Sequence, residues 1–257
     1  MNKKYLSIIL FGVIFLSSFL KVFAENNNQN QTLSCFFDDK VKELQAVLEN
    51  KDLDYLSQYN QELKLRKEIL LNILDCLILE AQNYKNTVLG INISKTAVGD
   101  FRKKLINELD KEIDYLNFRK SQIQNLSLEG LKYTAKSLKE DRQSRFLPLN
   151  QVINNFILWN KNEELFNLAE NRIDEISKII KIFKPDENEE IKSLFEDFSS
   201  KFKLAVNKHN EAWNAIDAFD NEKSSLLIQD SLNNLLEVYK LIYDFSKKTS
   251  VLMSIPK

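Results

Sequence analysis

The chain has 257 residues, of which 44% are apolar and 28% charged, as is usual for a globular fold. It holds only four glycines and three prolines. Folds rich in β-strands need more turn residues than this, so the composition predicts an all-α protein. The formal net charge of −1 argues against a nucleic-acid partner, because nucleic-acid binders carry a basic surface.

The first 24 residues have the layout of a secretory signal peptide, expected to be cleaved after Ala24. Lys3 and Lys4 precede a nearly unbroken apolar run over residues 5–20, and small residues stand before the expected cleavage site. The run is short for a membrane span, which takes about 20 apolar residues. We therefore expect a secreted, periplasmic or cell-envelope protein. The alternative is an uncleaved N-terminal helix, which would be its contact with a membrane.

Residues 25–34 form a polar linker, and the chain contains two cysteines, Cys35 and Cys76. Outside the cytoplasm such a pair usually forms a disulfide. If the first helix continued through Cys35, that residue would fall short of Cys76 along the second helix. A disulfide therefore needs an extended segment at Cys35 or a later turn. Two separate thiols remain the alternative.

The first half of the mature chain shows helical periodicity with three interruptions. A short helix before a turn at residues 49–52 and a long helix over residues 53–89 are expected. Residues 90–99 break the pattern, and Thr96 is expected to cap the third helix. Gly130 predicts a kink or break. The apolar positions expected to face inward are Phe37, Val41, Leu44 and Leu48; Leu70, Leu74, Leu77, Ala81, Tyr84 and Val88; Leu105, Leu109, Ile113, Leu116 and Ile123; and Leu131, Ala135 and Leu138.

In the second half, Pro148 is expected to start a helix, residues 160–162 to interrupt it, and Pro185 to start the next helix. The helix from Pro185 to Phe219 has the most regular pattern of the chain. Its apolar stripe steps by four and three residues and needs another helix to cover it, as in a coiled coil. The stripe comprises Ile191, Phe195, Phe198, Phe202, Ala205, His209, Ala212, Ile216 and Phe219. Elsewhere the inward positions are Val152, Phe156, Trp159, Phe166, Ala169, Ile173, Ile176, Ile180 and Phe183, then Ile228, Leu232, Leu235, Tyr239 and Ile242.

These patterns predict an all-α fold, an elongated antiparallel bundle of six to eight helices. Residues 35–257 are expected to form a single bundle, because no proline- or glycine-rich linker divides them. A subdivision near residue 148 is the alternative.

His209 is the only histidine, with Glu211 and Asp217 nearby, and we interpret it as a packed residue of the stripe. A single histidine cannot supply the ligands of a di-iron bundle or of a zinc-protease helix. The loop Gly90–Thr96 lacks the second glycine of a phosphate-binding loop. Asp217, Asp220 and Glu222 lack the spacing of a calcium-binding loop. No metal, cofactor or catalytic residue is therefore predicted.

Two surface features remain open. A modestly basic face could meet an anionic lipid or polymer, although a solvated face is favoured; it comprises Lys132, Lys136, Lys139, Arg142 and Arg145. Formal glycosylation sequons begin at Asn30, Asn92 and Asn125, and they matter only in a host with that machinery.

The functional hypothesis is an exported, non-enzymatic protein that offers a helical surface to an unknown protein partner. The first alternative is a ligand-sensing or solute-binding bundle, with a pocket lined by Trp159, Trp213 or the phenylalanines. The second is a hydrolase with an unfamiliar site, which would show perturbed carboxylates in a cleft.

Overall fold

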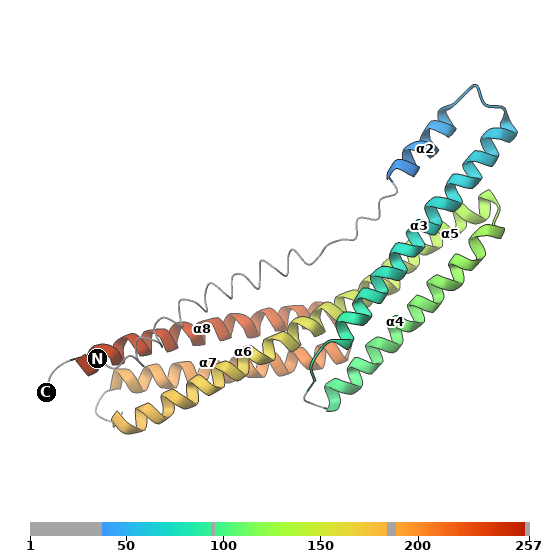
Figure 1. The fold of residues 1–257 in the computed structure, drawn as a ribbon. Coiled ribbons are helices and arrows are strands. Elements are labelled where there is room, and N and C mark those ends of the chain that lie inside the picture. Colours follow the sequence, from blue (N-terminus) through green and yellow to red (C-terminus); the bar gives the residue numbers. More distant parts are fainter. Residues whose placement is uncertain (1–37, 94–95, 184–188, 255–257) are drawn as a thin grey trace. The chain divides into compact units, whose positions relative to one another are not determined.

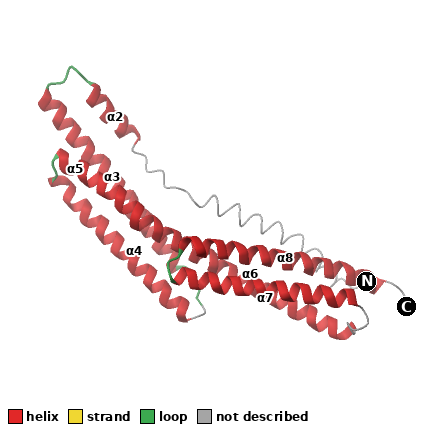
Figure 2. Ribbon diagram, turned by 180° about the vertical axis from the view of Figure 1, so that it is seen from behind, coloured by secondary structure: helices red, strands yellow, loops and turns green. Residues whose placement is uncertain are grey.

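The computed structural model describes residues 38–93, 96–183 and 189–254. These residues are helical throughout apart from short connections, with no strand among them (Figures 1 and 2). The all-α prediction is therefore confirmed. The expected signal peptide and the polar linker lie outside the described residues. Within the described part, no helix combines the length and apolar character needed to cross a bilayer.

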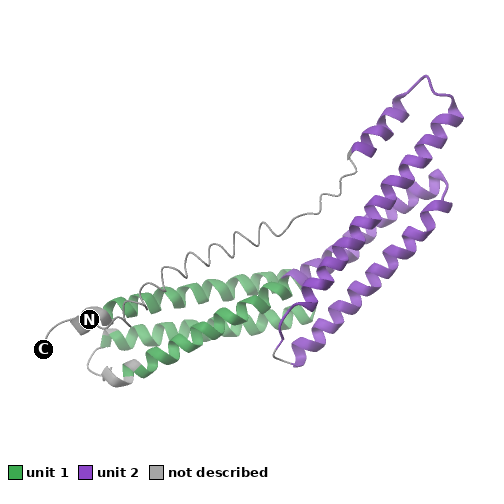
Figure 3. Cartoon of the chain, in the orientation of Figure 1, with its two compact units in different colours: residues 1–31, 155–257 green, residues 32–154 purple. Residues whose placement is uncertain are grey.

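The chain divides into two compact units, and the division falls between Asn154 and Asn155, within one helix (Figure 3). In unit 2 the structure describes residues 38–93 and 96–154, and in unit 1 residues 155–183 and 189–254. The division lies shortly after Pro148, near which the sequence allows a subdivision.

Unit 2 begins with a helical hairpin. Helix α2 (Asp38–Glu49) packs against α3 (Tyr55–Leu89). The inward position predicted for Leu48 is wrong, because this residue lies at the end of α2 and is exposed. Asp54 caps α3, because its Oδ1 accepts hydrogen bonds from the amides of Leu56 and Ser57 at 3.0 and 3.1 Å. Helix α4 (Thr96–Gln122) then runs antiparallel to α3. It begins at Thr96 itself, so the break expected over residues 90–99 is shorter and Gly99 is helical.

The α4–α5 turn reverses the chain where the sequence predicts a kink or break. A single 3₁₀ turn (Ile123–Asn125) follows α4, and α5 (Leu128–Asp141) returns alongside α4 (Figure 1). Ser127 caps α5 by accepting the Gly130 amide at 3.3 Å. Gly130 is therefore in the first turn of the new helix rather than at the break.

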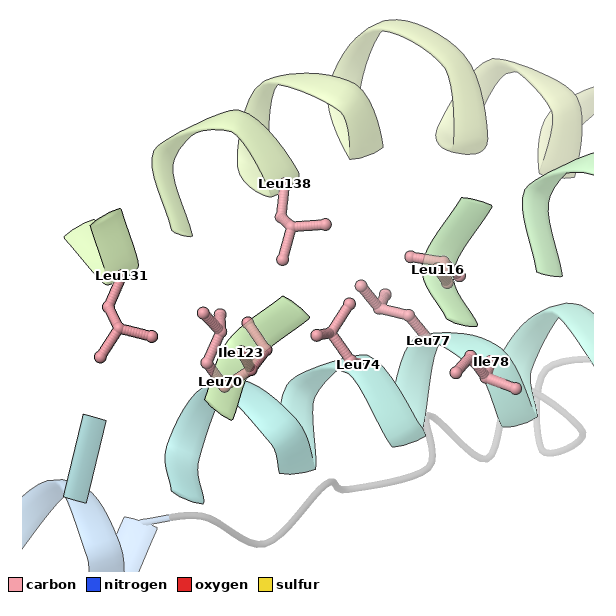
Figure 4. Close-up of a cluster of buried hydrophobic side chains, with 8 residues drawn as sticks. All are labelled: Leu70, Leu74, Leu77, Ile78, Leu116, Ile123, Leu131 and Leu138. Carbon is pink, nitrogen blue, oxygen red and sulfur yellow. The ribbon is translucent and has the colours of Figure 1, made fainter. Parts of the chain in front are cut away.

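The core of unit 2 lies between α3, α4 and α5 (Figure 4). Its α3 members are Leu70, Leu74 and Leu77 of the predicted stripe, with Ile78 added. Farther along α3, Ala81 and Val88 of that stripe are also buried. On α5, Thr134 is buried between Leu131 and Leu138. Its neighbour Ala135, which the sequence places inside, is exposed. The core comprises Leu70, Leu74, Leu77, Ile78, Leu116, Ile123, Leu131 and Leu138.

The expectation that Pro148 starts a new helix is wrong. Helix α5 continues through a π-helical turn, η2 (Arg142–Phe146), directly into α6 (Leu147–Phe183). The amide of Leu147 donates to the carbonyl of Arg142, five residues back. Proline lacks an amide hydrogen, and in a regular α-helix its ring crowds the carbonyl four residues back. The wider π turn before Pro148 fits that requirement, so the helix continues.

Unit 1 consists of the remainder of α6 with α7 (Glu189–Asp217) and α8 (Asn221–Ser254), which run antiparallel to their neighbours (Figure 3). The interruption expected at residues 160–162 is wrong, since α6 passes through them and buries Asn162. The expected start of α7 at Pro185 lies outside the described residues.

The stripe of α7 faces α6 and α8, as the sequence predicts. None of its nine positions is exposed. Phe198 packs with Ile176 and Ile180 of α6 and with Phe245 of α8. Ala205 lies in a second cluster with Phe166, Ala169 and Leu235. The three helices thus share one continuous apolar seam.

Candidate functional site

The most unusual feature of unit 2 is a group of polar side chains around the π turn, which we call the η2 cluster. It draws on α3, α4, α5, η2 and the start of α6, and its members are Glu80, Glu112, Tyr115, Arg119, Ser137, Asp141, Arg142, Arg145 and Asn150. Charged groups between packed helices are expensive unless they are paired. The contacts of the cluster therefore decide its role.

One arm of the cluster ties η2 to α3. An Arg142 Nη2 lies 3.2 Å from a carboxylate oxygen of Glu80. The Asn150 side-chain amide donates to the same carboxylate at 3.4 Å. Glu80 therefore holds two residues of the continuous α5–α6 helix, one on each side of Phe146, which is itself buried.

The second arm ties η2 to α4. Arg145 reaches the buried Glu112 at 3.3 Å, and its Nε lies 4.0 Å from Asp141. Burial raises the pKa of the Glu112 carboxyl above its ordinary value, with a smaller opposing effect from Arg145. Glu112 also falls on the stripe of α4 that buries Leu105, Leu109 and Leu116.

A third group of contacts joins α4 to α5. The Tyr115 hydroxyl donates to Asp141, and Arg119 donates to the same hydroxyl at 3.0 Å. Arg119 also donates to Ser137, which in turn donates to Asp141 at 3.3 Å. Arg145 lies over the Tyr115 ring at 4.6 Å. These contacts link α4 to α5, whereas the Oδ1 of Asn150, another member of the cluster, is buried without a hydrogen-bond partner among the described residues.

This geometry favours a structural role for the cluster. Glu112 and Asp141 are the kind of carboxylate pair that acid–base catalysis uses. Both, however, already face cations or hydroxyls of this chain, and most contacts of the cluster join α3 or α4 to the continuous α5–α6 helix. The expected basic face is also divided. Arg142 pairs with Glu80 and Arg145 with Glu112. The three lysines of the face, Lys132, Lys136 and Lys139, are exposed on α5.

Replacing Glu112 by glutamine is expected to reduce the pH dependence of stability. The free energy of unfolding should fall less between pH 4 and pH 7 in E112Q than in wild type. A carboxyl whose folded-state pKa is raised stabilises the fold fully below its unfolded pKa, and this contribution is lost as the pH rises through the folded pKa. Glutamine stays neutral and retains an acceptor for Arg145. Urea unfolding at pH 4 and pH 7 measures the difference, with E129Q, at an exposed position, as the control. Equal losses in E112Q and wild type would contradict this assignment.

A second group, the His209 cluster, lies between α6 and α7 of unit 1. The imidazole of His209 is 4% exposed and stacks on Trp159 at 4.9 Å, with Phe166 at 4.5 Å. Its Nε2 is 3.6 Å from Glu163. Trp159 donates its indole hydrogen to the His209 carbonyl at 2.9 Å and contacts the Trp213 ring at 4.7 Å. Trp159 therefore packs on both His209 and Trp213, and these contacts give no support to a solute site.

Replacing His209 by leucine is expected to leave stability unchanged or to raise it by about 1 kcal/mol. Neither ring nitrogen has a hydrogen-bond partner among the described residues, and leucine removes those unsatisfied atoms at similar volume. Thermal unfolding followed by circular dichroism measures the effect. W159F is the comparison, because it removes a satisfied hydrogen bond and should cost about 1 kcal/mol. A loss above about 2 kcal/mol in H209L would show that the imidazole has a polar task.

The remaining sequence candidates do not assemble into a site. Asp220 caps α8 by accepting the Lys223 amide at 3.1 Å, and no metal-binding group of His, Cys, Asp and Glu occurs among the described residues. The loop from Gly90 is described only up to Ile93. Asn92 and Asn125 are exposed, whereas Asn30 lies outside the described residues.

Cys76 lies on α3 and is disulfide-bonded. Cys35, the other cysteine of the sequence, lies outside the described residues. The Cys35–Cys76 pairing accordingly remains a proposal, and its test is given below.

Comparison of the chain with protein-family models, with curated proteins and with solved structures gives no match. A function can therefore be inferred only from the side chains and surfaces of the molecule itself.

Proposed function

We propose that this protein is an exported, non-enzymatic helical protein that binds a protein partner through its α2–α3 tip. The α2–α3 tip is defined as residues 47–59, the turn between the two helices with its adjoining helical turns. The observation that carries the proposal is the exposure of large apolar side chains there: Tyr55 is 81% exposed, Leu56 65% and Leu48 44%. Exposed apolar groups gathered in one place favour an interaction site.

The tip extends past the other helices of unit 2. Lys67 donates to the carbonyl of Gln124 at 2.6 Å, which places the α4–α5 turn beside α3 about a third of the way along that helix. Helix α3 begins at Tyr55, about 18 Å before Lys67 at 1.5 Å per residue. Figure 1 shows α2 and the first turns of α3 reaching beyond the α4–α5 turn. Among the described residues, this portion of α3 is thus accompanied by α2 alone.

The α2–α3 hairpin has a poorly covered apolar side. Val41, Leu44 and Val47 of α2 are only half-buried, although they occupy its apolar face. An amphipathic helix pair normally buries such a face against a third element. A partner that supplies an apolar helix or strip would complete this packing.

The charges of the hairpin favour a protein partner over a polyanion. Lys40 pairs with Glu68 at 2.7 Å and lies 3.4 Å from Glu43. Acidic and basic groups alternate here rather than forming a basic surface, which nucleic acids and anionic lipids would require.

The test compares two double substitutions with the same residue types. Y55S/L56S changes the α2–α3 tip, and L226S/Y243S changes exposed residues of α8. The full-length chain and both variants are expressed in the native host, and photo-crosslinks formed from residue 52 are mapped by mass spectrometry. We expect one protein to be crosslinked to wild type and to L226S/Y243S, and its yield to fall at least tenfold in Y55S/L56S.

Equal crosslinking of that protein by all three chains would contradict the assignment of the surface. Absence of a crosslinked protein in wild type would contradict the proposed function. The N-terminal peptide of the recovered chain tests export, since a first residue at Glu25 agrees with cleavage and Met1 does not.

A further inference from the structure

We propose that residues 33–37 form a disulfide clasp on α3. They pack against the outer stripe of that helix, and a bond between Cys35 and Cys76 holds them there. The outer stripe is defined as Leu65, Ile69, Cys76 and Leu79, which share one face of α3. The clasp rests on the Cys35–Cys76 pairing, concerns unit 2 only, and does not depend on the proposed partner.

The outer stripe lies on the side of α3 that faces away from the core. Leu74 and Leu77 point from α3 into the core (Figure 4). Asp75 pairs with α4 and Glu80 pairs with η2. At about 100° per residue, Cys76 falls between Asp75 and Glu80 on the opposite side from the core. The outer stripe is therefore left to α2 and to the chain that precedes α2.

Helix α2 covers only one end of the outer stripe. Lys40, in the first turn of α2, pairs with Glu68 at 2.7 Å. Leu65, one turn earlier on α3, is 4% exposed. Glu68 precedes Cys76 by eight residues, and Leu79, beyond Cys76, is 41% exposed. The stripe thus continues past the start of α2.

The disulfide identifies what covers the rest of the stripe. Cys76 is disulfide-bonded, and Cys35 is the one other cysteine of the sequence. It stands three residues before Asp38, the first residue of α2. Because α2 is antiparallel to α3, the chain before Asp38 continues toward Cys76. A bond to Cys76 therefore places residues 33–37 over the outer stripe.

These five residues are apolar where the position requires it. They read Leu-Ser-Cys-Phe-Phe, whereas residues 25–32 contain no apolar side chain. Phe36 and Phe37 would meet Ile69, which is half-buried between Cys76 and the start of α2. On the other side of Cys76, Leu33 would meet Leu79.

The disulfide is what keeps the segment docked. Five residues bury too little apolar surface to offset the entropy that is lost when they are ordered. A dithiol reductant transfers two electrons and two protons to the bond and becomes a disulfide itself, which leaves Cys35 and Cys76 as thiols. The clasp then opens and uncovers the outer stripe. An exported chain meets the oxidising conditions that close it.

The first test measures how readily the clasp closes. The full-length chain is equilibrated with mixtures of reduced and oxidised glutathione, and the fraction carrying the Cys35–Cys76 bond is measured by mass spectrometry. We expect F36S/F37S to lower the equilibrium constant for closure at least tenfold, because the docked phenylalanines bring Cys35 to Cys76. F118S, at a phenylalanine that is 60% exposed on α4, should leave it unchanged. A change below twofold in F36S/F37S, or an equal fall in F118S, would overturn the proposal.

The second test leaves residues 33–37 unchanged, so it holds even if F36S/F37S unfolds. A photo-crosslinking residue at position 79 should react with residues 33–37 in the oxidised chain, and at least tenfold less with them after reduction. The same residue at position 133, where Tyr133 is 72% exposed on α5, is the control and should not reach them. Equal yields before and after reduction, or no crosslink from position 79 to residues 33–37, in a chain with helical circular dichroism, would overturn the clasp.

Discussion

Replacing Phe198 by alanine is expected to lower the free energy of unfolding by about 3–5 kcal/mol, as for other phenylalanines removed from a protein core. Phe198 is 0% exposed. Its ring meets Phe195 at 5.0 Å and Phe245 at 6.0 Å, both edge-on. The substitution would leave a cavity between three helices. Urea unfolding followed by circular dichroism measures the loss.

Leu204→Ala on the same helix is the control for F198A. Leu204 is 42% exposed, so little packing is lost and the expected cost stays below about 1 kcal/mol. Similar losses in F198A and L204A would show that the stripe of α7 does not face the interior.

Removing the proposed disulfide with C35S/C76S is expected to lower the free energy of unfolding by about 4 kcal/mol, on the chain-entropy model for a loop of this length. Because Cys76 is disulfide-bonded and the sequence holds one other cysteine, the prediction concerns Cys35. Peptide mapping without reductant identifies the bonded pair. Urea unfolding then compares the oxidised chain with C35S/C76S.

The bounds of the hairpin set what this bridge requires. Cys76 lies about 32 Å along α3 from Tyr55, and α2 returns over about 17 Å, at 1.5 Å per residue. The bridge therefore requires the chain before Asp38 to continue about 15 Å further along α3. The pairing would be contradicted if the oxidised and reduced wild-type chains were equally stable. It would also be contradicted if both cysteines of the untreated chain could be alkylated.

Periodicity was sufficient to predict the helices because their packing is repetitive. Every position predicted for the stripe of α7 is buried or half-buried, including His209, since a helical period of 3.6 puts these positions on one face. Ala215 is also buried and was not predicted. The α3 stripe succeeds for the same reason. On α5, in contrast, Thr134 is buried and Ala135 is exposed. Which of the two faces inward depends on the packing of α5 against neighbouring helices, and the local sequence does not contain that information.

Two helix boundaries predicted from local composition are wrong, because tertiary contacts keep the helix continuous there. Residues 160–162 have the polar composition of a turn, yet α6 passes through them because the apolar seam on both sides holds one continuous helix. Pro148 is typical of a helix start, and the sequence carries no direct sign that a π turn can accommodate it within a longer helix.

The η2 cluster was missed, although one signal for it is present. Glu112 interrupts an otherwise apolar stripe between Leu109 and Leu116, and a carboxylate at such a position requires a partner. The identity of that partner, Arg145, follows only from the return of α5 alongside α4. The exposure of Tyr55 and Leu56 likewise depends on where the α4–α5 turn ends.

The most direct test of the central claim is thiol reactivity along α7, with single cysteines placed at Phe198, Ala205 and Ala212 and at Glu196, Lys203 and Asn210. The first three positions are buried and the last three are exposed. We expect maleimide labelling at the buried set to be at least tenfold slower, with the helical period visible along the chain. Equal labelling at all six positions, in a chain that retains its helical circular dichroism, would contradict a fold built on this seam.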